Sequence, residues 1–228
     1  MTILGPFAFF GVLEKLVVPG DAAATASNII ASEGLFRSGI AAFLIVIIAD
    51  IAVAWALYVL LSPLDQFVAQ LVAWLRLAYA AVYAAALVHL MDAAQILNSA
   101  GQSPTGELDQ IHAQAMSAIG SFRNGWDIGL AIFGLHLVGV GILLVRSTSF
   151  PRFLGFFVAL AGGGYLLDSF GAILSPDYLH ISALTAVGEA LLIPWLLWGS
   201  VTGFRSDSDN DPGPASRPAS KSPASVAS

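Results

Sequence analysis

The chain has 228 residues, of which 57% are hydrophobic and only 11% are charged, and its formal net charge is −6. A soluble domain carries roughly 25% charged residues, so this composition argues against a soluble protein. The chain has no basic patch for nucleic acid and no cysteine for a disulfide or a thiolate metal site. Several apolar runs approach the ~20 residues that span a bilayer. We therefore predict an all-α, polytopic transmembrane helix bundle in contact with the lipid bilayer.

The first predicted element is a short apolar helix over Ile3–Val18, which Pro19 and Gly20 end. Asp21 is a good N-cap for a small interfacial helix over Ala22–Ser32. Between Leu108 and Phe122, apolar residues spaced by three or four predict a further amphipathic helix on the membrane or on the bundle. The remaining predicted helices are longer: Leu35–Leu61, Gln66–Leu97, Asn124–Val145, Phe153–Leu174 and Ile181–Val201. We thus expect about six spans with short interfacial helices.

The chain divides into a membrane-embedded helical domain over residues 1–204 and a polar tail over residues 205–228. The tail is rich in Ser, Pro, Ala and Asp, cannot bury apolar surface, and is expected to be disordered. Arg146 and Arg152 flank one short loop, and positive residues favour the cytoplasmic side. We therefore expect a multi-pass protein of the cell membrane with both termini in the cytoplasm.

Two opposite charges lie inside predicted spans, where ionisable residues are costly and often functional. Asp50 lies about 11 residues before the end of its helix, and Arg76 lies about 10 residues after the start of the next one. Both are thus ~15–17 Å from the same membrane surface. Because a short turn joins these helices, they are antiparallel neighbours, and the matched depth predicts an ion pair.

A second polar set is expected in the outer half of the bundle. His89 and Asp92 share one helix face because they are three residues apart, and they are the candidate metal ligands. The other members of the set are Asp127, His136, Asp168 and Glu189. Histidines and carboxylates at one depth could hold Zn²⁺ or another divalent ion. The nine-residue spacing of Asp127 and His136 places them on opposite sides of a regular helix, so hydrogen bonding between helices is the main alternative.

The positions of several glycines indicate where helices contact one another. Gly125 and Gly129 are four residues apart, and Gly162–Gly164 form a run inside an apolar span. Small residues let transmembrane helices approach closely. We expect these glycines to lie where helices pack.

Four ordered stretches carry a family resemblance. They are Val18–Ile40, which contains PGDAAATASNIIASEGLFRSG, Leu57–Leu64, Trp74–Ala80 and, most densely, Trp126–Phe170. In these stretches the chain resembles the domain of unknown function 4386, a family of bacterial integral membrane proteins mostly from actinobacteria and their relatives. The resemblance implies a multi-helix membrane fold and brings no activity or cofactor. The first helix of family members is longer, with residues ahead of the position of Met1. We therefore expect either that the native start lies upstream of Met1 or that the first helix is incomplete here.

Two functions remain open from the sequence. The first is a non-enzymatic membrane protein with a polar interior: a small-molecule binder, a carrier or a partner subunit. The second is an integral-membrane, metal-dependent hydrolase with a site in the outer half of the bundle, where a metal-bound water would act as nucleophile. The sequence contains no HExxH motif or other specific catalytic signature, and it identifies neither a ligand nor a cofactor.

Overall fold

The computed structural model describes residues 3–100, 107–147 and 150–175, and these residues contain helices and no strand. The elements are α1 (Leu4–Pro6), the π-helix η1 (Phe7–Leu13), α2 (Glu14–Leu16), α3 (Ala22–Ala31), α4 (Glu33–Leu61), α5 (Gln66–Ala100), α6 (Leu108–Arg146) and α7 (Arg152–Leu174). Four of them, α4 to α7, are long and apolar enough to cross a membrane. The predicted all-α membrane bundle is confirmed.

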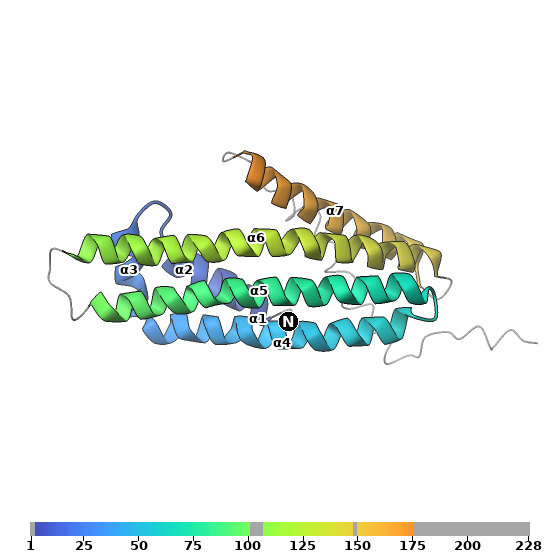
Figure 1. Cartoon of the computed structure of the whole chain (residues 1–228), viewed down its shortest axis with the longest axis horizontal. Helices are drawn as coiled ribbons and strands as arrows, with labels where there is room; N and C mark the ends of the chain where they lie inside the picture. The colour runs from blue at the N-terminus through green and yellow to red at the C-terminus, as the bar shows by residue number, and fades with distance from the viewer. Residues whose placement is uncertain (1–2, 101–106, 148–149, 176–228) are drawn as a thin grey trace, which may run out of the picture.

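The bundle is built from long antiparallel helices. The helices α4, α5 and α6 run side by side, and α7 lies against α6 and diverges from it toward the end of α7 (Figure 1). A tight turn over residues 62–65 joins α4 to α5, and Asp65 begins α5 by accepting hydrogen bonds from the backbone N–H groups of Phe67 and Val68. Asp21 caps α3 in the same way, through the N–H of Ala24, as the sequence predicts.

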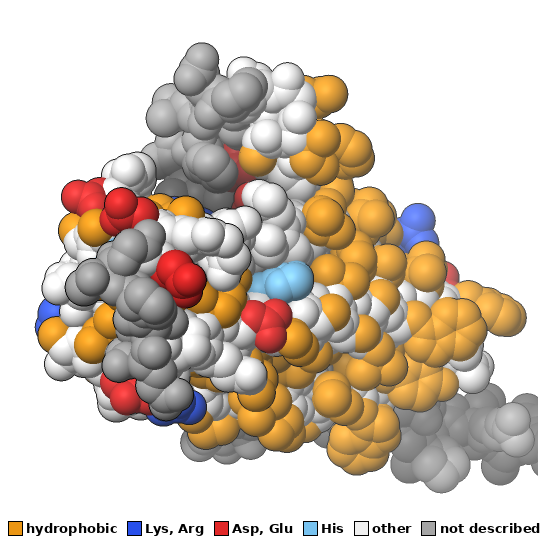
Figure 2. All heavy atoms as spheres, turned by 60° about the vertical axis from the view of Figure 1, so that its left-hand side comes forward, with side chains coloured by type: hydrophobic (Ala, Val, Ile, Leu, Met, Phe, Trp, Pro, Cys, Tyr) orange, Lys and Arg blue, Asp and Glu red, His pale blue; other side chains and the backbone are white. Residues whose placement is uncertain are grey.

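Two helices are much longer than a bilayer requires. The 39 residues of α6 and the 35 residues of α5 correspond to ~58 Å and ~52 Å, against a hydrocarbon core of ~30 Å. Figure 2 shows charged side chains gathered at the end of the bundle where α3 lies, while hydrophobic side chains cover the surface toward the other end. We therefore place the apolar layer next to the α4–α5 turn and the polar end beyond it.

The amphipathic segment predicted over Leu108–Phe122 is not a separate helix. It continues without a break into the following span as α6, and its stripe of Ala115, Ile119 and Phe122 is buried in the bundle. The continuation is possible because α6 approaches α5 at this level. A Cβ atom on Gly125 would lie only 2.7 Å from the Cβ atom of Ala86, so the predicted packing role of Gly125 holds.

The number of spans differs from the prediction in one place. The first predicted helix consists of three consecutive stretches of three, seven and three residues, α1, η1 and α2, and it is not among the four helices of spanning length. It packs on α4, where a Cβ atom on Gly39 would lie 2.8 Å from Val12. The predicted last span, Ile181–Val201, and the tail over residues 205–228 lie outside the described residues.

The contact between α6 and α7 depends on four glycines. A Cβ atom on Gly141 would lie 2.6 Å from the carbonyl oxygen of Gly155, and a Cβ atom on Gly155 would lie 2.7 Å from that of Gly141. Gly134 and Gly162 make the same reciprocal contact two helical turns away along both helices. Gly162 therefore packs as predicted, whereas no atom of the described residues lies within 4 Å of a Cβ atom on Gly163.

Candidate functional site

The centre of the candidate site is a buried ion pair between α4 and α5. Nη2 of Arg76 donates to Oδ1 of Asp50 at 2.5 Å, and the two side chains are only 8% and 1% exposed. The pair is the one that matched depth predicts. Because each charge lies in an apolar layer, each depends on the other to be tolerated there.

His136 from α6 completes the centre. Its Nδ1 lies 2.9 Å from the carbonyl oxygen of Val72, and its Nε2 lies 3.1 Å from Nη1 of Arg76. A carbonyl only accepts and an arginine only donates, so these partners assign the proton of a neutral imidazole to Nδ1. Asp50, Arg76 and His136 therefore form a centre with no net charge.

The position of His136 corrects the predicted outer-half set. His136 lies about 10 residues before the end of α6, which is the depth of Arg76 after the start of α5. Its side chain is fully buried. His136 belongs with Asp50 and Arg76 rather than with His89. The reason is that α6 runs antiparallel to α5, so the end of α6 lies at the same level as the start of α5.

Aromatic rings cover one side of the centre. The ring of Phe133 stacks on His136 at 5.6 Å, and the guanidinium of Arg76 lies 5.3 Å from the centre of the same ring. Tyr79 contacts Phe133 at 4.9 Å. An aromatic face stabilises a cation that is withdrawn from water, so Phe133 supports the charge of Arg76 where solvent is excluded.

The aromatic cluster continues toward the polar end of the bundle. Tyr83 and Trp126 meet edge to face at 4.6 Å, and both rings also contact Phe43 and Phe122. Trp126 is thus partly buried against the core of the bundle. Tyr83 is 1% exposed.

Three buried polar atoms near the centre have unused hydrogen-bonding capacity. They are Oδ2 of Asp50, Nε of Arg76 and Oη of Tyr83, which find no partner among the described residues. Tyr83 follows Arg76 by seven residues, so it lies on the same face of α5. Side chains on a helix lean toward its N-terminus, and the ring of Tyr83 contacts that of Tyr79, one turn nearer to Arg76, at 5.7 Å. The sequence analysis did not single out Tyr83. Its seven-residue spacing from Arg76 indicates the shared helix face, but it does not show that the hydroxyl has no partner.

The two candidate metal ligands, His89 and Asp92, lie apart from this centre. His89 and Asp92 lie on α5 with their side chains 45% and 49% exposed, and their nearest atoms, Nδ1 and Oδ2, are 3.7 Å apart. Asp168 is buried on α7 and Asp127 is partly buried on α6. Glu189 lies outside the described residues. Within the described part of the chain, no group of three or more His, Asp or Glu side chains could hold a metal ion.

Four apolar helices of spanning length, with a buried polar centre of no net charge between α4, α5 and α6, define an integral membrane helix bundle. The chain belongs to the family of the domain of unknown function DUF4386, which it matches over residues 1–199. It is also similar to a protein of Archaeoglobus fulgidus that bears the name "Uncharacterized protein", with 29% identity over 153 residues, 67% of this chain and 78% of that protein. The source of this relative is an archaeon, so the likeness is not confined to bacteria. No solved structure matches the chain.

Proposed function

We propose that this protein is a non-enzymatic membrane protein that binds a small, uncharged polar molecule at the Asp50–Arg76–His136 centre. The supporting observation is the unused capacity of Oδ2 of Asp50, Nε of Arg76 and Oη of Tyr83 among the described residues. A buried polar atom without a partner costs about 1–3 kcal/mol, so a ligand that satisfies these atoms gains affinity from them.

The charges of the centre favour an uncharged ligand. Asp50 and Arg76 neutralise each other, and the partners of His136 fit a neutral imidazole. A charged ligand would have no counter-ion left in this apolar layer. Oδ2 of Asp50 would accept from a ligand N–H or O–H group, Nε of Arg76 would donate to a ligand oxygen, and the hydroxyl of Tyr83 could do either.

The test is to identify what co-purifies with the protein. Native mass spectrometry of the full chain in mild detergent should detect a bound small molecule, which the double variant Asp50→Asn with Arg76→Gln should lose while keeping the centre uncharged. The matched control is Glu33→Gln with Arg37→Gln, because this second Arg–carboxylate pair of α4 is about half exposed and lies outside the centre. Equal retention of the molecule by all three proteins, or no bound molecule in any of them, would refute the proposal.

The metal-dependent hydrolase has less support from the described residues, because His89 and Asp92 are half-exposed and bring no third ligand. Metal analysis separates the two functions. Zinc present in equimolar amount and lost in His89→Ala would favour the hydrolase and contradict the binder.

We also propose that the α4–α5 turn and the connection between α6 and α7 face the cytoplasm of a cell-membrane protein. Arg146 ends α6 and Arg152 begins α7, and cytoplasmic connections carry an excess of Lys and Arg.

A further inference from the structure

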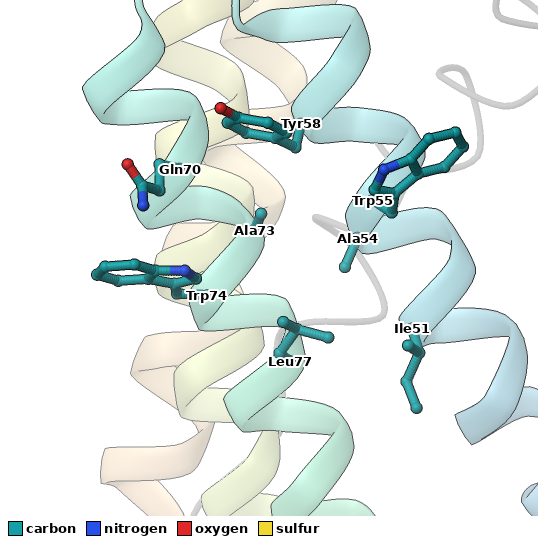
Figure 3. Close-up of a pocket in the computed structure, with 8 residues that line it drawn as sticks. All are labelled: Ile51, Ala54, Trp55, Tyr58, Gln70, Ala73, Trp74 and Leu77. Carbon is teal, nitrogen blue, oxygen red and sulfur yellow. The ribbon is translucent and has the colours of Figure 1, made fainter.

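A groove runs along the outer surface of the bundle between α4 and α5, separate from the buried centre. Its volume is about 380 Å³. Ala54 and Ala73 form its floor, since they are buried while the neighbouring Trp55 and Trp74 are 71% and 61% exposed. Figure 3 shows the two indoles on opposite edges of the groove. The groove exists because alanines occupy the floor positions where α4 and α5 face each other.

The groove changes in polarity along its length. Tyr58 and Gln70 line the end next to the α4–α5 turn, and Ile51 and Leu77 line the opposite end (Figure 3). Tyr58 lies only ~5 Å along the axis from the end of α4, whereas Ile51 lies ~15 Å from it. The hydroxyl and the amide are thus close to the membrane surface, and the aliphatic side chains lie deeper in the apolar layer.

We propose that this groove binds one hydrocarbon chain of a membrane lipid, with the lipid headgroup at Tyr58 and Gln70. A lipid has the same polarity gradient, with a hydrogen-bonding headgroup at the surface and an apolar chain below it. A transmembrane helix of a partner or of a second copy would be apolar at both levels and would leave Tyr58 and Gln70 unused. Tyr and Trp side chains also favour the level of the headgroups.

This lipid site goes beyond the proposed function, because none of its residues belongs to the Asp50–Arg76–His136 centre. It can therefore be tested whether or not a polar ligand exists. The probe is palmitoyl-oleoyl phosphatidylethanolamine, titrated into the delipidated full chain in detergent and followed by native mass spectrometry.

Wild type should bind a first lipid distinctly more tightly than later ones. Ala73→Leu should weaken this first binding at least tenfold, because the larger side chain fills the floor. Ala84→Leu is the matched control, since Ala84 lies on the exposed surface of the same helix and outside the groove. It should bind the first lipid as wild type does.

A second groove variant keeps the proposal testable if Ala73→Leu misfolds. Tyr58→Phe with Gln70→Leu removes the polar end and leaves the floor intact, and it should weaken the first binding severalfold. Equal first binding by wild type and both groove variants would overturn the proposal. Because the chain contains no cysteine, Leu77→Cys introduces a unique thiol. Efficient disulfide cross-linking of two Leu77→Cys copies in membranes would also overturn it, since a second copy would then cover the groove.

Discussion

Replacing Asp50 should show how much the buried ion pair contributes to the stability of the protein. Asp50→Asn removes the negative charge and leaves Arg76 uncompensated in an apolar layer. We expect the free energy of unfolding to fall by about 3 kcal/mol, near the lower limit for breaking a buried pair. Denaturation in mixed micelles measures this loss.

A double-mutant cycle shows whether the loss arises from the pair. Asp50→Asn with Arg76→Gln should recover part of the stability, because no lone charge remains. Arg37→Gln in the exposed pair with Glu33 should leave the melting temperature nearly unchanged. If the losses from Asp50→Asn and Arg76→Gln simply add in the double variant, the two side chains do not interact.

Residue contacts at this centre were predictable only in part from the sequence. Asp50 and Arg76 could be paired because a short turn fixes the relative depth of α4 and α5. His136 was not placed with them, although the predicted end of its helix at Val145 gives it nearly the same depth, because the sequence does not show which helices α6 contacts. The unsatisfied hydroxyl of Tyr83 was also hidden, since a buried tyrosine and a packing phenylalanine give the same apolar spacing.

Gly155 tests the helix contact between α6 and α7. Alanine normally stabilises a helix relative to glycine by up to ~1 kcal/mol. At Gly155 the added Cβ atom would lie 2.7 Å from both the carbonyl oxygen of Gly141 and the backbone nitrogen of Val145. Backbone atoms cannot move aside as a side chain can, so Gly155→Ala should destabilise the bundle by about 1–3 kcal/mol, the usual cost of overpacking.

Gly163→Ala is the matched control on the same helix. Nothing lies within 4 Å of a Cβ atom there, so this variant should be neutral or slightly more stable than wild type. Thermal unfolding in detergent measures both variants. A loss of stability for Gly163→Ala as large as for Gly155→Ala would show that the loss does not arise from the close contact of Gly155 with α6.

The helices themselves were largely predictable, because apolar runs and the Asp21 cap mark most of them. The joining of residues 108–122 to the following span was not. The polar residues Arg123 and Asn124 favoured a break at the membrane surface, but the helix continues because Gly125 lets α6 stay against Ala86. An unbroken hydrogen-bonding ladder then outweighs the change in polarity along the helix.

At the scale of the whole molecule, orientation in the membrane is the first testable feature. A reporter fused at Ser149 should lie in the cytoplasm and one at Ser103 outside, because Arg146 and Arg152 flank the connection that contains Ser149. Alkaline phosphatase and fluorescent-protein fusions measure the two sides. Alkaline phosphatase activity of a fusion at Ser149 would place Ser149 outside the cytoplasm and contradict the proposed orientation.

The polar tail is the second such feature. A chain that ends after Arg205 should express and melt like the full chain, because the composition of residues 206–228 gives them no core to join. Thermal melting of the two proteins side by side measures the difference. A clear fall in melting temperature for the shorter chain would assign the tail to the folded domain.

The unbroken course of α6 has a mechanical consequence. One continuous helix carries His136 at the level of the buried centre and Ala115 and Ile119 at the polar end, where α3 packs. When one part of an unbroken helix tilts or rotates, the rest of the helix tends to move with it. We therefore expect that a shift of the His136 imidazole would also move the far end of α6, and that a molecule bound at that end would affect the hydrogen bond between His136 and Arg76.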